Sequence, residues 1–93
     1  MIEARDNPDR SRFEAFLDGQ RVGDLTYSID GSVITLIHTR IKPEFERNGY
    51  GTALVTQALD LIRDTGMSVI ALCDFASAVI DDRPDYADLL KEA

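Results

Sequence analysis

The chain has 93 residues, of which 44% are hydrophobic and 29% charged, and it carries a formal net charge of -7. This length favours one domain spanning residues 1–93, and the acidic charge argues against nonspecific nucleic-acid binding, which needs a basic surface. The single cysteine excludes an intrachain disulfide and, together with the single histidine, argues against a metal site. No apolar run reaches the roughly 20 residues of a membrane helix, so we expect a cytoplasmic protein without membrane association.

The first half of the chain predicts an antiparallel meander. Residues 12–17 alternate apolar and polar side chains, and Asp18-Gly19 predicts a type I′ hairpin turn into a return strand over residues 20–29. Asp30-Gly31 predicts a second turn of the same type, followed by a strand rich in β-branched residues over 33–41. Weaker signals predict a short edge strand beginning near Ile2 and Ala4 and a bulge at Gly23.

The second half predicts a strand–helix–strand crossover. Apolar residues recur at three- and four-residue spacing over 51–64, which predicts an amphipathic helix, and Gly66 suits the left-handed position that ends a helix. The nearly unbroken apolar run 67–73 predicts a parallel strand covered on both faces. A short helix over 75–82 and a final turn or helix over 85–91 follow.

The segment between the third strand and the long helix contains Gly49-Tyr50-Gly51. Backbone amides at the start of a helix are unpaired and that end of the helix is positive, so glycines there predict a cradle for a phosphate group. A tight loop without a ligand is an equally good interpretation of these glycines alone. The segment is neither a dinucleotide fingerprint nor a P-loop, because the third glycine and the Gly-Lys-Ser/Thr sequence are both absent.

In this context the chain resembles the GNAT superfamily of acetyl-CoA-dependent N-acetyltransferases, and within it the small single-domain GNAT-like proteins. The resemblance covers nearly the whole chain and implies an α+β fold with a mixed sheet and short C-terminal helices. It rests on the order of predicted elements and on five motifs besides the pyrophosphate loop Glu46–Gly51, which are Asp6-Asn7-Pro8, Ser11-Arg12-Phe13, Ile37-His38-Thr39, Cys73-Asp74-Phe75 and Pro84–Leu89.

The resemblance also implies a site for acetyl-CoA. The strand around His38 to Ile41, which includes Thr39 and Arg40, would pair its backbone with the pantetheine arm. This strand and the Met67–Cys73 strand would splay apart and leave a slot for the acetyl thioester. The loop would hold the pyrophosphate through the amides of its residues, which are Arg47, Asn48, Gly49, Tyr50, Gly51 and Thr52. Phe75, Arg83 and Tyr86 are further candidates for cofactor contact, although packing is the stronger interpretation of Tyr86.

Cys73 and His38 are the candidate catalytic residues. Cys73 ends the parallel strand, at the edge where such sheets place their sites, and a thiolate there could accept the acetyl group; alternatively it lines the slot while an amine attacks directly. Asp74 beside it is expected to raise the pKa of the thiol. His38 is two residues from Leu36 and four from Ile34, so we expect it on the same, packed face of the strand. There it is either a base that deprotonates the acceptor ammonium or a histidine packed in the core.

Three departures from the family pattern bear on function: Glu46 in the pyrophosphate loop, Asp81-Asp82 where basic residues are usual, and Val79 where an aromatic residue is usual. We expect an N-acetyltransferase that acts on an amine, namely a protein lysine, a polyamine or a small amine, as a monomer or weak homodimer. A noncatalytic CoA-binding module is the alternative, and a protein that binds a basic partner through its acidic C-terminal segment is the third.

Overall fold

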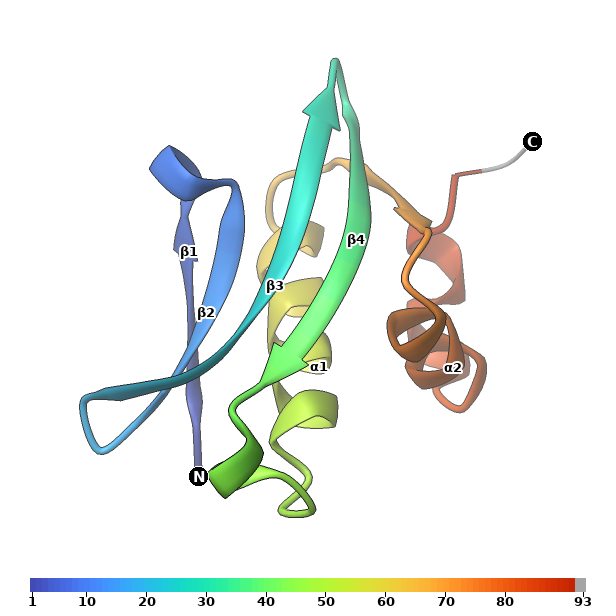
Figure 1. Cartoon of the computed structure of the whole chain (residues 1–93). Coiled ribbons are helices and arrows are strands. Elements are labelled where there is room, and N and C mark those ends of the chain that lie inside the picture. The colour runs from blue at the N-terminus through green and yellow to red at the C-terminus, as the bar shows by residue number, and fades with distance from the viewer. Residues whose placement is uncertain (92–93) are drawn as a thin grey trace.

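The computed structural model describes residues 1–91, which form a five-stranded sheet packed against two helices (Figure 1). The strands are β1 (Glu3–Asn7), β2 (Arg12–Leu17), β3 (Gln20–Asp30), β4 (Val33–Ile41) and β5 (Ser68–Ala71). The helices are α1 (Tyr50–Arg63) and α2 (Asp74–Asp81), with short 3-10 helices η1 (Pro8–Arg10), η2 (Pro43–Phe45) and η3 (Pro84–Leu89). None of the helices within residues 1–91 is long and apolar enough to cross a membrane.

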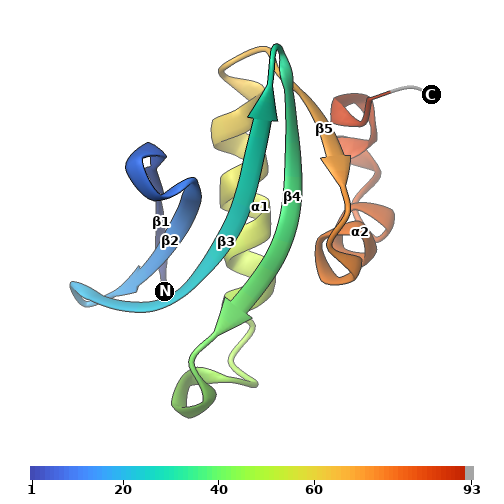
Figure 2. The ribbon, with the colours of Figure 1, turned by 45° about the horizontal axis from the view of Figure 1, so that its top comes forward.

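The sheet has the order β1-β2-β3-β4-β5, in which only β4 and β5 pair in parallel. The predicted meander is therefore confirmed, with β1 as a fourth antiparallel strand at its edge. The predicted crossover is also confirmed, since α1 joins β4 to its parallel neighbour β5 (Figure 2).

The two predicted hairpin turns differ in type. Asp18 and Gly19 have φ angles of 51° and 83°, so the first turn has the two positive φ angles of type I′, as predicted. In the second, Asp30 pairs with Val33 and the loop is Gly31-Ser32. Only Gly31 has a positive φ, of 60°, so this turn follows the type II′ pattern and the expectation of a second type I′ turn was wrong.

Each of the two longest strands contains a bulge. In β3 the register shifts beside Gly23, which confirms the predicted bulge. A Cβ at Gly23 would lie 2.5 Å from the carbonyl oxygen of Arg40, so the absent side chain lets β3 and β4 approach closely. In β4 the register shifts between His38, which pairs with Thr26, and Leu36, which pairs with Tyr27, and this leaves Ile37 unpaired.

The core lies between one face of the sheet and the helices. The apolar stripe of α1 is fully or almost fully buried against this face and comprises Leu54, Val55, Ala58, Leu59 and Ile62. The helix begins at Tyr50, one residue before the predicted start, because Gly49 serves as its N-cap with a φ of 76°. Gly66 has the expected positive φ, of 78°, in the turn that leads into β5.

The strand β5 is shorter and more exposed than predicted. The apolar run 67–73 was expected to form a strand covered on both faces, but β5 spans only Ser68–Ala71 and lies at the edge of the sheet. Val69 is buried toward the helices, whereas Ile70 and Leu72 are exposed on the opposite face, because both helices lie on one side. A parallel bridge from Leu90 to Val69 covers part of the outer edge.

Candidate functional site

The segment that leads into α1 has a defined backbone conformation. Arg47 and Gly49 adopt left-handed φ angles of 68° and 76°. The side-chain amide of Asn48 donates hydrogen bonds to the carbonyls of Phe45, at 3.1 Å, and Glu46, at 3.2 Å. Asn48 thus fixes the shape of the loop, while the glycine at 49 lets the chain turn sharply into the helix.

The backbone amides of this loop are available to a ligand. The first hydrogen bond of α1 runs from the amide of Ala53 to the carbonyl of Gly49, at 3.1 Å. Among the described residues, none accepts a hydrogen bond from the amides of residues 47–52. Unpaired amides together with the positive end of the helix dipole form an anion site.

A cavity of about 360 Å³ lies directly over these amides. It brings together eight of the twelve predicted cofactor residues, namely Thr39, Ile41, Arg47, Gly49, Tyr50, Gly51, Thr52 and Phe75. Phe45 and Glu46 complete its lining. A Cβ at Gly51 would lie 3.1 Å from the ring of Phe75, so this glycine lets α2 close one wall of the cavity.

The other four predicted cofactor residues do not line this cavity. The side chain of Asn48 forms hydrogen bonds within the loop itself. Arg40 lies on the face of the sheet without helices, where its guanidinium is 3.9 Å from the carboxylate of Asp24. Arg83 precedes η3. The hydroxyl of Tyr86 donates a hydrogen bond to Asp60 on α1, at 2.8 Å, which is a packing contact.

A second cavity, of about 430 Å³, lies between β1–β3 and the C-terminal end of α1. It is lined by side chains such as Phe13, Tyr27 and Leu61 and contains none of the predicted site residues. Its larger volume therefore does not make it the better candidate, because the unpaired amides lie at the other end of α1.

Cys73 lies beside the first cavity, where β5 gives way to α2. It is the N-cap residue of α2, and its buried Sγ lies 3.4 Å from Oγ1 of Thr39. Burial raises the pKa of the thiol, but hydrogen bonds from the Thr39 hydroxyl and from the backbone amides of Ala76, Phe75 and Thr39 outweigh burial. The pKa therefore lies below its ordinary value, and the expected increase due to Asp74 was wrong: hydrogen-bond donors from the fold decide it.

His38 does not face Cys73. Regular alternation along β4 would place His38 on the packed face. The bulge at Ile37 shifts this alternation by one residue, so Thr39 lies on the packed face instead and faces Cys73. His38 pairs with Thr26 and is exposed on the face of the sheet without helices. The expectation that His38 lies on the packed face was therefore wrong, because a bulge leaves no clear sequence signal.

The pairing of β4 with β5 ends before β4 does, and we call the place where it ends the slot. Their pairing ends at Leu36 and Ala71, and the carbonyl of Leu36 accepts hydrogen bonds from the amides of Leu72 and Cys73, both at 3.0 Å. Beyond this point β4 continues to Ile41 without β5 as a partner, because β5 ends at Ala71 and the chain enters α2. Thr39 and Cys73 face each other across the start of the slot.

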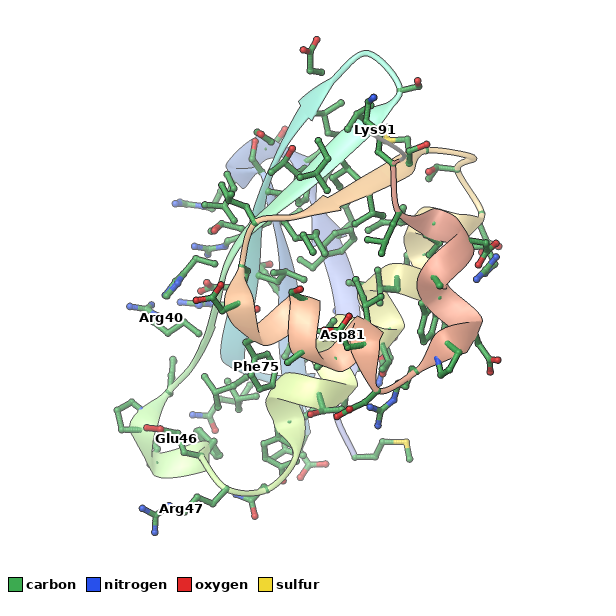
Figure 3. All side chains as sticks on the ribbon, turned by 90° about the vertical axis from the view of Figure 1, so that its right-hand side faces the viewer. Arg40, Glu46, Arg47, Phe75, Asp81 and Lys91 are labelled. Carbon is green, nitrogen blue, oxygen red and sulfur yellow. The ribbon has the colours of Figure 1, made fainter. Side chains whose placement is uncertain are left out.

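Charge in the cavity is mixed. Glu46 and Arg47 both line it, yet no ion pair joins them within residues 1–91 (Figure 3). Asp81 and Asp82 do not line it. Val79, where the family usually has an aromatic residue, is buried in the core and not in the site. No cluster of three or more metal-binding side chains lies within the described part of the chain.

Comparisons with known proteins bear on the family and the fold of the chain. A family model described as GCN5-related N-acetyl-transferase matches residues 12–89. None of the curated protein sequences compared with the chain matches it significantly. Among solved structures, a GCN5-like protein from Staphylococcus aureus superposes with a TM-score of 0.72 at 22% identity, covering 98% of this chain and 89% of that one.

Two larger enzymes share the fold over part of their length. PaiA N-acetyltransferase from Thermoplasma acidophilum, solved with coenzyme A, has a TM-score of 0.54 at 23% identity and covers 60% of this chain and 35% of its own. The ribosomal-protein-S18-alanine N-acetyltransferase from Escherichia coli has a TM-score of 0.64 at 18% identity, with 76% and 49% covered. The chain thus spans less than half of either enzyme, and at these identities the likeness concerns the fold.

Proposed function

The chain belongs to the GCN5-related N-acetyltransferases, and from this premise we propose that it binds acetyl-CoA over the start of α1 and transfers the acetyl group to an amine. The observation that carries the proposal is the row of unpaired amides over residues 47–52 beneath a cavity of about 360 Å³. A pyrophosphate fits such a site, because it is anionic and accepts several hydrogen bonds. The coenzyme A complex of the PaiA relative supports the same cosubstrate.

The chain's own residues have separate roles in this proposal. The amides of residues 47–52 bind the pyrophosphate, and the unpaired part of β4 from Thr39 to Ile41 orients the pantetheine arm. Acetyl-CoA supplies an activated acyl group, whose place is beside Thr39 and Cys73, which are in contact with each other. The acceptor is an amine of one of three kinds: a protein lysine, a polyamine or a small amine.

We assign Cys73 as the group that accepts the acetyl. Its lowered pKa increases the thiolate fraction, and the thiolate is the nucleophilic form. Sγ would attack the thioester carbonyl and CoA would leave as its thiolate. A neutral amine would then attack the acetyl carbonyl on Sγ, the S–acetyl bond would break to return the Cys73 thiolate, and the proton lost by the amine would pass through water to the CoA thiolate. Direct attack by the amine is the alternative. Cys73→Ala abolishes transfer in the first case and keeps it in the second.

A charge at residue 52 tests cofactor binding without disturbing the fold. Thr52 lines the cavity in the first turn of α1, where glutamate stabilises a helix but repels a pyrophosphate. We expect Thr52→Glu to weaken CoA binding at least about tenfold in a calorimetric titration, with an unchanged melting temperature. Thr52→Gln is the neutral control. Equal CoA affinity in both variants would contradict the proposed site.

A noncatalytic CoA-binding module is favoured by one observation, the carboxylate of Glu46 in the cavity. Such a module binds CoA, and CoA shifts the amide signals of residues 49–52 in NMR spectra. It releases no CoA from acetyl-CoA in the presence of any amine. Turnover that is lost in Thr52→Glu and kept in Thr52→Gln excludes this alternative.

A further inference from the structure

The face of the sheet opposite the helices carries an apolar cluster beside the slot. Ile37, Ile70 and Leu72 are 43%, 40% and 66% exposed, and we call them the open-face patch. Ile70 pairs with Thr35, which lies between two buried residues of β4 and therefore points away from the helices. Leu72 lies two residues further along, and Ile37 is the unpaired bulge residue next to it.

The position of the open-face patch is informative. Leu72 immediately precedes Cys73, and the amides of both residues bond to the same carbonyl, that of Leu36. Both helices lie on the other side of the sheet, so neither helix covers the open-face patch (Figure 2). Exposed apolar side chains gathered beside a reaction site are typical of a surface that binds a partner.

The charges on this face are unequal once its ion pairs are taken into account. Glu14 is paired with Arg12 at 2.7 Å, and Asp24 with Arg21 at 3.1 Å, and both carboxylates are almost entirely covered. Arg40 lies 3.9 Å from the already paired Asp24 and remains 64% exposed (Figure 3). Among these groups the face therefore offers one accessible cation, Arg40, while Asp30, on the same face at the end of β3, and Asp74, which directly follows Cys73, are exposed carboxylates.

The pKa of Glu14 supports this assignment of charges. Burial raises the pKa of that carboxyl, but hydrogen bonds from Arg12 and Asn7 and the nearby charges of Arg12 and Arg21 outweigh burial. The pKa is lowered, so Glu14 stays ionised and engaged with arginine. It is not free to bind an ammonium group of a ligand.

The rest of the chain has the opposite character. Residues 1–42 contain six basic and seven acidic side chains, whereas residues 43–93 contain four basic and ten acidic ones. A polycation would therefore be attracted toward residues 43–93 and repelled by Arg40. An acidic segment would be repelled by residues 43–93 and attracted by Arg40.

We propose that the open-face patch and Arg40 dock the acceptor, and that this acceptor is a polypeptide segment whose reactive amine is flanked by apolar and acidic residues. The inference rests on the proposed function and selects among its three acceptor classes. A free polyamine gains nothing from the patch and is disfavoured by Arg40. An apolar side chain next to the amine covers Ile37 and Leu72, while an acidic one reaches Arg40.

Two peptides that contain a reactive lysine test the proposal. In one peptide leucine and glutamate flank this lysine, and in the other serine and lysine flank it. Each is titrated, as is spermidine, into the ¹⁵N-labelled protein saturated with CoA. We expect the leucine–glutamate peptide to shift the amide signals of Ile37, Arg40 and Leu72 and to bind roughly threefold to fivefold more tightly than the other peptide at low salt. The difference decreases as the salt concentration rises.

Variants separate the two contributions. Leu72→Ser weakens binding of the leucine–glutamate peptide about threefold or more, whereas Leu61→Ser, which removes a side chain 39% exposed on α1, leaves it unchanged. Arg40→Gln reduces the preference between the two peptides. Tighter binding of spermidine, a preference for the leucine–glutamate peptide that neither variant changes, or shifts confined to α1 and α2 would overturn the proposal.

The same samples distinguish this proposal from the proposed function. CoA alone shifts the amide signals of residues 49–52 if the cofactor site is right, whatever the peptides do. If CoA shifts those signals and the peptides do not shift the open face, the acceptor proposal fails and the proposed function stands. If CoA shifts nothing, the proposed function fails and the acceptor proposal fails with it.

Discussion

Gly23 affects both the stability of the sheet and the shape of the first cavity, which we call the cofactor cavity because we propose that it holds CoA. The substitution Gly23→Ala tests both effects. A Cβ there would lie 2.5 Å from the carbonyl oxygen of Arg40 and 2.5 Å from Cδ1 of Ile41. The Ile41 methyl group can rotate away, but the carbonyl can move only with β4. Overpacking of this kind lowers the free energy of unfolding by about 1–3 kcal/mol.

For a domain of this size, a loss of about 2 kcal/mol lowers the melting temperature by roughly 8–16 °C. Circular dichroism during heating measures this change. Ile41 lines the cavity, so the displaced strand should also weaken CoA binding. Gly19→Asn is the matched control, because nothing lies within 4 Å of a Cβ at Gly19 and asparagine tolerates its positive φ. A melting temperature for Gly23→Ala within about 2 °C of the native value would refute the close approach of β3 and β4.

Four further predictions concern single side chains. Thr39→Val should raise the pH midpoint for alkylation of Cys73 by iodoacetamide, and Thr39→Ser should not, because the hydroxyl helps lower the pKa of the thiol. Since the native thiol ionises at lower pH than the unfolded one, the free energy of unfolding should rise with pH between these two pKa values, and Cys73→Ser should remove this rise in chemical denaturation. Tyr86→Phe should lower the free energy of unfolding by about 0.5–1.5 kcal/mol through loss of its bond to Asp60, with CoA affinity unchanged in calorimetry. Glu46→Gln should tighten CoA binding several-fold at low salt, and an equal affinity would mean that this carboxylate points away from the pyrophosphate.

The sequence predicts the elements of this fold well, because each has a local cause. Asp18-Gly19 needs positive φ angles, and the apolar stripe of α1 needs a surface to cover. The bulge at Ile37 has no such cause in the sequence. It depends on the register in which β4 pairs with both β3 and β5. Because of this bulge, Thr39 and not His38 faces Cys73.

Hydrophobicity alone does not show what covers a strand. The run 67–73 is apolar enough for a strand buried on both faces, yet Ile70 and Leu72 are exposed. Apolar side chains exposed next to one another, unlike scattered ones, are typical of a surface that binds a partner. The misjudged strand is therefore the same feature that points to an acceptor surface beside the slot.

The electrostatics of the site also depend on the fold more than on sequence neighbours. Of the described residues that line the cofactor cavity only Arg47 is basic, and Glu46 offsets it in a chain of net charge -7. The remaining positive potential comes from the backbone, because the first turns of both α1 and α2 border this cavity. The amides of α1 face the proposed pyrophosphate site, and those of Phe75 and Ala76 at the start of α2 stabilise the Cys73 thiolate. Backbone amides can thus provide the positive potential that the proposed pyrophosphate and the Cys73 thiolate require in an acidic protein, without a cluster of basic side chains.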